Sequence, residues 1–189
     1  MQNFEGKTAV ITGAASGIGL ALAEQAAAMR MNVVLADIEE NALEQAVKRI
    51  EERQVRAIGV PSNTMIEESV QALAERAFDE FGQVHLLCNN AGGASPATAG
   101  KAVWEVPDQD WDWVMGVNFY GVLYGIRAFV PHMLAHGEPS QIVNTASLAA
   151  LLPGGGTYGV SKHGVLALTE GLQRDFADRG ANINASVLC

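Results

Sequence analysis

Hydrophobic residues along this chain alternate between short β-branched runs and longer segments with helical spacing. The short runs predict six strands, at residues 8–12, 32–36, 56–60, 84–88, 141–145 and 182–188. The longer segments predict helices at residues 17–29, 41–53, 66–81, 108–135 and 157–178. Strands separated by helices imply right-handed crossovers and a buried parallel sheet. We therefore expect an α/β fold with a doubly wound, Rossmann-like sheet of about six strands.

Neither a linker-like shift in composition nor an internal repeat interrupts this alternation, so we expect one domain over residues 1–189. Apolar residues make up 49% of the chain, and its 189 residues are enough for a sizeable core. Gly82 and Gly180 fall where glycines commonly end helices.

Charge and composition limit the partners. The formal net charge of −9 argues against nucleic acid, because phosphate binding needs clustered Lys and Arg. Residues 1–5 lack the basic and apolar regions of a secretory signal. We expect no membrane span, because Glu24 and Arg30 interrupt the Ala-rich stretch. Cys88, Cys189 and the histidines show neither a disulfide framework nor metal-ligand spacing, so we expect a reduced cytoplasmic setting and no metal.

Tyr158 and Lys162 lie four residues apart within a predicted helix. Residues i and i+4 share one face of a helix, so Lys162 would lie beneath the Tyr158 ring. A nearby positive charge favours the phenolate, which makes a tyrosine usable as a general acid or base. Ser147, at the end of an apolar run, could supply a hydroxyl to the same site. Together these residues indicate redox chemistry on an alcohol or a carbonyl.

A glycine-rich segment follows the first predicted strand and opens the first predicted helix. Glycine permits a tight turn and close backbone approach, and a helix N-terminus offers free N–H groups to a pyrophosphate. The glycine spacing differs from the commonest dinucleotide fingerprint, because the close pair comes last, and a purely structural turn is the alternative. The predicted cofactor contacts of this segment are Gly13, Ser16, Gly17, Ile18 and Gly19.

Asp37 ends the second predicted strand. A carboxylate there can accept hydrogen bonds from the adenosine ribose hydroxyls and would repel a 2′-phosphate. Neither the residues that follow Asp37 nor the glycine segment contains an Arg or Lys to neutralise that phosphate. The sequence therefore favours NAD over NADP, and capping of the next helix is the alternative role for Asp37.

The order and spacing of these features resemble the short-chain dehydrogenase/reductase family over essentially the whole chain. The family pattern Thr-Gly-x-x-x-Gly-x-Gly matches residues 12–19, and Asn-Asn-Ala-Gly matches residues 89–92. Asn118, Ser147 and the Tyr-x-x-x-Lys pair follow in register. The resemblance implies an NAD-dependent oxidoreductase that passes hydride between the carbinol carbon of a secondary alcohol and nicotinamide C4.

The resemblance also implies a role for each matched position. Tyr158 would be the general acid/base, and Lys162 would support it and hold the nicotinamide ribose. Ser147 would hydrogen-bond the substrate oxygen, and Asn118 would order a water in the proton path. Further cofactor contacts implied by the resemblance are Asn63, Thr64, Asn90, Ala91 and Gly92.

Three departures from the family pattern stand out. Asn63 occupies a position where the family usually has an aspartate that binds the adenine amino group, and its amide oxygen can still accept that bond. The segment from Ser147 to Tyr158 is shorter than usual and contains three consecutive glycines. The chain stops at Cys189, where relatives continue into a substrate lid and a last strand. We expect the sequence to be a fragment of a longer enzyme.

Two other functions stay open. One is a catalytically silent nucleotide-binding or scaffold protein with the same fold. The other is nucleotide-sugar epimerisation, although such proteins have a different glycine spacing and a larger C-terminal domain. The resemblance further implies a homodimer or homotetramer, formed through the helices at 108–135 and 157–178. The expected substrate is a small-molecule alcohol or ketone, and the mainly apolar or small residues Ala94, Ser95 and 148–153 favour a hydrophobic or bulky one.

Overall fold

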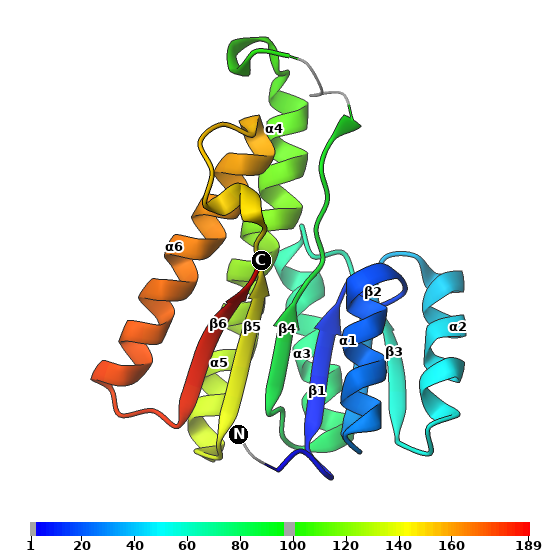
Figure 1. Cartoon of the computed structure of the whole chain (residues 1–189). Helices are drawn as coiled ribbons and strands as arrows, with labels where there is room; N and C mark the ends of the chain where they lie inside the picture. The colour runs from blue at the N-terminus through cyan, green and yellow to red at the C-terminus, as the bar shows by residue number, and fades with distance from the viewer. Residues whose placement is uncertain (1–2, 97–100) are drawn as a thin grey trace.

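A parallel β-sheet forms the centre of the computed structural model, which describes residues 3–96 and 101–189 (Figure 1). Residues 1–2, considered above for a secretory signal, lie outside the described residues. Within the described part, six strands pair in the order β3-β2-β1-β4-β5-β6. Their ends differ by at most two residues from the predicted ranges, and they are β1 (Thr8–Thr12), β2 (Asn32–Asp37), β3 (Ala57–Pro61), β4 (Leu86–Asn89), β5 (Ser140–Thr145) and β6 (Ile183–Leu188).

Helices connect the strands, as predicted. The predicted long helix is continuous but contains a π-helical turn, which was not foreseen and which includes Asn118. Such turns often occur at functional sites. The helices are α1 (Gly17–Ala28), α2 (Glu40–Glu51), α3 (Glu67–Phe81), α4 (Asp108–Met115), the π turn η3 (Gly116–Tyr120), α5 (Gly121–His136) and α6 (Gly156–Asp178), with short turns η2 (Val103–Glu105) and η4 (Leu148–Ala150).

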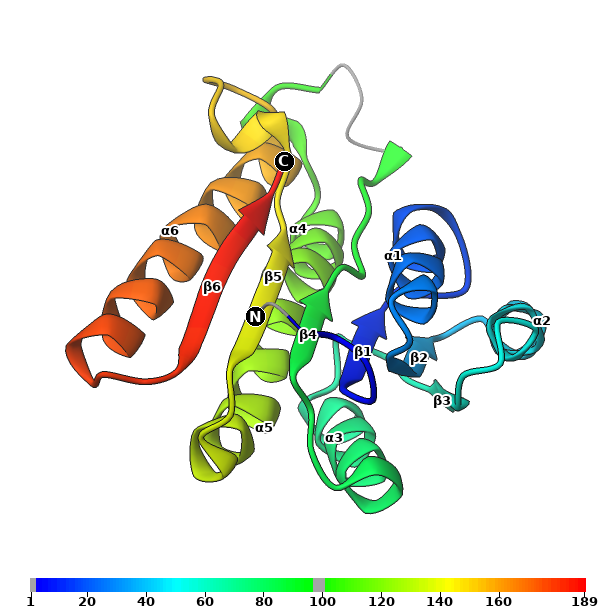
Figure 2. The ribbon, with the colours of Figure 1, turned by 60° about the horizontal axis from the view of Figure 1, so that its bottom comes forward.

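The sheet is buried on both faces. Successive side chains of a strand point to opposite faces. In β1, Ala9 and Ile11 pack with residues of α1 and α2, whereas Val10 packs with residues of α3 and α5. All three are fully buried, because helices cover both faces of the sheet (Figure 2). The expected doubly wound α/β fold is therefore confirmed.

One long apolar helix was not recognised in the sequence as a candidate membrane span. The stretch Asp108–His136 is long and apolar enough to cross a membrane by length and composition. However, 44% of its most apolar window is buried inside the protein. Phe129 and Met133 of this stretch are fully buried in the core formed with the sheet and α3. These contacts are those of a core helix, whose apolar composition is explained by packing.

The strand order creates a crevice. β1 pairs with β2 on one side and with β4 on the other, so the loops that follow β1 and β4 leave the sheet in opposite directions. In open parallel sheets, ligands bind at this point, outside the carboxyl ends of the strands. These carboxyl ends lie at the top of the sheet in Figure 1.

Candidate active site

A cleft of about 950 Å³ opens at the carboxyl edge of the sheet. Loops that follow five of the strands, together with α6, contribute to its wall. Asn118 is fully buried and does not line the cleft. The predicted residues that do line it are Gly13, Ser16, Gly17, Ile18, Gly19, Asp37, Asn63, Thr64, Asn90, Ala91, Gly92, Ser147, Tyr158 and Lys162.

The glycine segment forms a cradle that a side chain would fill. Gly13 has a φ of +65°, and a Cβ atom there would lie 2.9 Å from the Cα atom of Ala91. A Cβ atom on Gly19 would overlap the carbonyl oxygen of Gly13. Helix α1 begins at Gly17, and Ser16 does not cap it with its side chain. This cradle beside a helix N-terminus fits a dinucleotide pyrophosphate.

Asp37 connects the cradle to the next helix. Its Oδ2 atom accepts a hydrogen bond from the Ala15 N–H at 2.9 Å, and its Oδ1 atom accepts one from the Glu39 N–H at 3.1 Å. The second of these bonds spans two residues and forms an Asx-type turn before α2, whose N-terminus has no side-chain cap. Asp37 also lines the cleft. Each carboxylate oxygen can accept a second bond, so Asp37 still has acceptor capacity for ribose hydroxyls.

Asn63 and Thr64 lie at the end of the cleft near α3. The Oδ1 atom of Asn63 accepts a hydrogen bond from the Met65 N–H at 3.0 Å, within a turn. Thr64 packs closely against Gly121, where a Cβ atom would lie 3.0 Å from the Thr64 Cβ. The amide oxygen that was predicted to face adenine is therefore already engaged once, and one acceptor position is left.

Thr12 fixes the loop that follows β4, a role that sequence reasoning missed. Its hydroxyl oxygen accepts hydrogen bonds from the N–H groups of Asn90 at 2.9 Å and Ala91 at 3.0 Å. Asn90 returns a bond from Nδ2 to the Thr12 carbonyl at 3.1 Å and accepts one from the Thr145 hydroxyl at 3.2 Å. The sequence did contain an indication of this role. Thr12 and Thr145 are polar residues that each end a buried strand.

Tyr158 and Lys162 lie together on the cleft-facing end of α6. Lys162 Nζ is 5.7 Å from the centroid of the Tyr158 ring. Tyr158 is half-buried and belongs to the first turn of the 23-residue helix, whose N-terminus carries partial positive charge. The ammonium and the helix terminus thus both place positive charge near the Tyr158 ring. The predicted i, i+4 pairing is seen in the structure.

The Lys162 ammonium is buried and has no carboxylate partner among the described residues. Its side chain donates a hydrogen bond to the carbonyl oxygen of Thr145 at 2.8 Å. Burial lowers the pKa of Lys162 from 10.5 to about 8. A positive charge is thus placed next to the phenol without a counter-ion that would neutralise its effect.

Ser147 lies where β5 ends and η4 begins. Its Oγ atom accepts a hydrogen bond from the Ala149 N–H at 3.2 Å, and the residue lines the cleft. The segment that follows was expected to line the substrate pocket, but Leu148, Leu151 and Leu152 are more than half exposed and lie outside the cleft wall. Ala94 does line the cleft. Ser95 donates a hydrogen bond to Asp110 at 2.5 Å and is not part of the wall.

Asn118 binds the loop after β4, in which Gly93 lines the cleft. Its Oδ1 atom accepts a hydrogen bond from the Gly93 N–H at 2.8 Å. Its Nδ2 atom donates to the Gly93 carbonyl at 2.9 Å and to Ser161 Oγ at 3.0 Å. The amide is therefore occupied on both sides by protein groups. The predicted ordering of a water molecule by Asn118 stays a prediction.

An apolar wall of the cleft was also missed. Trp113 and Val117, four residues apart on the long helix, both line the cleft together with Ile38 and Met65. The Trp113 ring packs against Gly93. A Cβ atom on Gly93 would lie 2.9 Å from the Cη2 atom of Trp113. The helical spacing of Trp113 and Val117 was visible in the sequence, but their contact with loops from other strands was not.

Comparison with known proteins agrees with this geometry. The sequence profile described as "short chain dehydrogenase" matches residues 7–189. The chain is 38% identical over 189 residues to 1-deoxy-11-beta-hydroxypentalenate dehydrogenase of Streptomyces exfoliatus, covering 99% of this chain and 67% of that protein. It is 32% identical over 184 residues to diacetyl reductase [(S)-acetoin forming] of Staphylococcus epidermidis, covering 95% of this chain and 69% of that protein.

A solved structure is similar over the full chain. A short chain dehydrogenase/reductase from Burkholderia phymatum, crystallised in complex with NAD, superposes with a TM-score of 0.95 and is 46% identical. The match covers 100% of this chain and 66% of that one. The chain therefore spans about two thirds of the length of its relatives.

Proposed function

Since this chain belongs to the short-chain dehydrogenase family, we propose that it is an NAD-dependent oxidoreductase acting on a secondary alcohol or the corresponding ketone. One observation carries the proposal. The phenol of Tyr158, the buried ammonium of Lys162 and the cradle at Gly13 share a single cleft at the carboxyl edge of the sheet. A nucleotide-binding scaffold would not need a buried, unpaired lysine beneath a half-buried tyrosine.

Three residues of the cleft have distinct roles in the proposed reaction. Tyr158 exchanges a proton with the substrate oxygen, and Lys162 stabilises the phenolate form that accepts it. Ser147 donates a hydrogen bond to the same substrate oxygen and fixes its position. When bound in the cradle, NAD supplies the hydride acceptor or donor. The protein thus handles the proton and the orientation of the substrate.

The preference for NAD over NADP belongs to the same proposal. Asp37 places negative charge beside the cradle, where a 2′-phosphate would require positive charge. Lys162 is the one cation among the described residues that line the cleft, and it is bonded to Thr145. The solved relative from Burkholderia phymatum binds NAD, which supports the same choice.

The setting and assembly are proposed more coarsely. We propose a cytoplasmic homodimer or homotetramer that forms through the long helix and α6. Three exposed apolar side chains on these helices support this interface, namely Tyr120, Leu134 and Val160. Light scattering after size-exclusion chromatography measures the assembly, and a monomer at all concentrations would contradict it.

A fluorescence titration with NADH and NADPH tests the cofactor. We expect clear binding of NADH and much weaker binding of NADPH. Replacement of Asp37 with Ser should narrow this preference, because the negative charge is lost. Asp79→Ser is the matched control, since Asp79 is an exposed aspartate on α3 that does not line the cleft. Equal affinity for the two cofactors in the wild type would contradict the proposed preference.

Turnover is tested with a panel of ketones and alcohols at 340 nm. We expect oxidation of NADH with at least one ketone, because Ser147, Tyr158 and Lys162 line the same cleft. Tight NADH binding without turnover of any compound in the panel would favour a catalytically silent nucleotide-binding protein instead.

A further inference from the structure

Ser161 is a fully buried serine between the two proposed catalytic positions, and the mechanism above does not use it. Its Oγ atom accepts a hydrogen bond from Asn118 Nδ2 at 3.0 Å and lies 2.7 Å from the carbonyl oxygen of Tyr158. An amide nitrogen can only donate and a carbonyl oxygen can only accept. The serine proton must therefore point to Tyr158, so the bond sequence runs in one direction from Asn118 to α6.

This bond sequence continues into the loop that lines the cleft. The Asn118 side chain makes two hydrogen bonds to the backbone of Gly93. Its Oδ1 atom accepts from the Gly93 N–H, and its Nδ2 atom donates to the Gly93 carbonyl. The first turn of α6 is thereby connected to the segment after β4 through two side chains. Ser161 is the member that connects the helix carrying Tyr158 to the Asn118 amide.

Close packing makes the connection sensitive to movement. A Cβ atom on Gly92 would lie 2.8 Å from Asn118 Oδ1 and 3.3 Å from Lys162 Nζ. The Asn118 amide and the Lys162 ammonium therefore both approach Gly92 so closely that a side chain would have no room there. Because the amide is bonded to Gly93 and packed against Gly92, a movement of the amide would be transmitted to this loop.

We propose that Ser161 is a positioning residue, which holds the Asn118 amide so that Gly92 and Gly93 stay in place opposite Tyr158 and Lys162. The proposal rests on the proposed function, because it assigns Ser161 to the same cleft. Ser161 does not touch a substrate or cofactor in this account. It acts through Asn118, and a change at Ser161 should be felt first at the Gly93 amide.

Helix α6 offers a matched control two turns away. Thr169 is also buried, donates a hydrogen bond to the Val165 carbonyl at 2.6 Å and accepts one from Asn144 Nδ2 at 2.9 Å. Thr169 thus makes the same kinds of bond as Ser161, one to a backbone carbonyl and one from an asparagine. That asparagine, Asn144, is bonded to Asn89 and not to Gly93. Ser161→Ala and Thr169→Val each remove one buried hydroxyl from the same helix.

The primary measurement is hydrogen exchange of the Gly93 amide by NMR, which does not depend on turnover. We expect exchange at Gly93 to be at least about tenfold faster in Ser161→Ala than in the wild type, and unchanged in Thr169→Val. We also expect kcat to fall roughly 10- to 100-fold in Ser161→Ala alone, because small misplacements of a catalytic site are costly. If Ser161→Ala does not fold, Ser161→Cys retains the packing with a weaker hydrogen-bonding group and decides instead.

A double-mutant cycle separates positioning from a general loss of stability. If Ser161 acts through Asn118, Ser161→Ala should change kcat little in an Asn118→Ala background. Equal Gly93 exchange in Ser161→Ala and Thr169→Val, with equal effects on kcat, would overturn the proposal. A wild-type protein without any ketone reductase activity would overturn the proposed function, while the Gly93 exchange would still decide the role of Ser161.

Discussion

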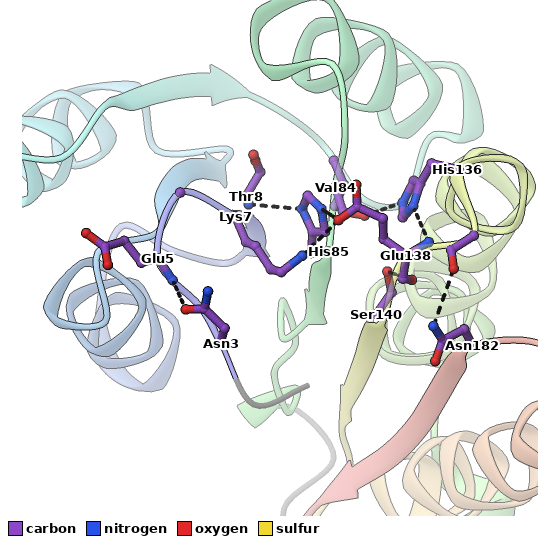
Figure 3. A network of polar contacts seen from close by, with 12 residues as sticks. Asn3, Glu5, Lys7, Thr8, Val84, His85, His136, Glu138, Ser140 and Asn182 are labelled. Atoms are coloured by element: carbon purple, nitrogen blue, oxygen red, sulfur yellow. Dashed lines mark hydrogen bonds and ion pairs between the residues drawn. The ribbon is translucent and has the colours of Figure 1, made fainter.

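The two edges of the sheet use ionisable groups in opposite ways. At the amino edge, Lys7 Nζ and His85 Nε2 both contact Glu138 Oε2, at 2.9 and 3.2 Å, so the charges are paired (Figure 3). At the carboxyl edge, the ammonium of Lys162 has the neutral carbonyl of Thr145 as its partner. Removal of one partner from an ion pair destabilises a fold, whereas a buried charge without a counter-ion costs stability by itself and is typical of functional sites.

Hydrogen bonds define the protonation of the amino edge. His85 Nδ1 accepts a bond from the Thr8 N–H at 3.2 Å, so the neutral ring carries its proton on Nε2 and donates it to Glu138 (Figure 3). Burial lowers the pKa of His85. The hydrogen bond from Lys7 lowers the pKa of Glu138 to about 2. This cluster joins the starts of β1 and β4 to the segment before β5, which is a structural task.

Replacement of Tyr158 with Phe should have the largest effect on the carboxyl edge. Removal of the hydroxyl deletes the proposed general acid/base, so we expect kcat to fall by about 10² to 10⁴. NADH affinity should be nearly unchanged, because the ring is retained. Kinetics at 340 nm and a fluorescence titration measure the two quantities. Tyr120→Phe, at an exposed tyrosine, is the control, and more than a small percentage of wild-type turnover in Tyr158→Phe would refute the assignment.

Lys162→Met should lose activity yet gain stability, which tests the contrast between the edges directly. At neutral pH, the lowered pKa of Lys162 means that the buried ammonium costs roughly 3 kcal/mol of the free energy of unfolding. The variant regains this cost but loses the hydrogen bond to Thr145, which contributes about 1 kcal/mol. We therefore expect the free energy of unfolding to rise by about 1–2 kcal/mol. Lys7→Met should instead lower it, because Glu138 then keeps only His85 as a partner.

The pH dependence of stability gives the sign of the Lys162 contribution. The unfolded lysine keeps its proton up to about pH 10.5, whereas the folded one releases it near pH 8. Wild-type stability should therefore increase with pH between about 8 and 10.5, and Lys162→Met should lack this increase. Urea unfolding at pH 7 and pH 10 measures it. An identical pH response of the two proteins would show that the buried ammonium carries no such cost.

Glu138→Gln should have a smaller effect, confined to stability. The folded pKa of Glu138 lies below its usual 4.5, so its stabilising contribution is present above pH 4.5 and is lost as the pH falls towards 2. We expect a lower melting temperature at pH 7 and a flatter acid limb in the variant. Glu67→Gln, which breaks an exposed ion pair with Arg127, should lower the melting temperature less. An equal decrease in both variants would remove the distinction.

His85→Asn should have the smallest effect. Because the folded pKa of His85 lies below 6.5, the unfolded chain binds the proton more readily, and stability should fall as the pH drops below 6.5. The variant should show a shallower decrease than the wild type between pH 7 and pH 5. His163→Asn, at an exposed histidine on α6, is the control variant. Calorimetry at several pH values provides the comparison.

The sequence predicted the carboxyl edge far better than the amino edge. Alternating apolar runs place every strand within two residues, and the i, i+4 rule brings Lys162 to Tyr158. Both are local properties of the chain. The cluster of Lys7, His85 and Glu138 joins residues far apart in the sequence, and no spacing rule connects them.

The roles of Asn118 and Thr12 show the same limit within the site. A motif identified Asn118, but its bonds to Gly93 and Ser161 depend on how the long helix packs against α6. Thr12 begins the glycine pattern at residues 12–19, yet its bonds to Asn90 and Ala91 exist only because β1 and β4 are neighbours. Side-chain partners across the sheet follow from the tertiary fold and could not be read from local pattern.

The π-helical turn at Gly116–Tyr120 has a consequence for the phase of the long helix. A π turn accommodates one extra residue, which offsets the angular position of everything that follows by roughly 100° relative to an unbroken α-helix. Trp113 can therefore face the cleft while Phe129, farther along the same helix, faces the core. Deletion of a single residue between 116 and 120 would restore a regular α-helix. The part that carries Trp113 would then be rotated relative to the part that carries Phe129, so the two side chains could not both keep their present orientations. The length of this helix, counted to the residue, is thus part of the specification of the site.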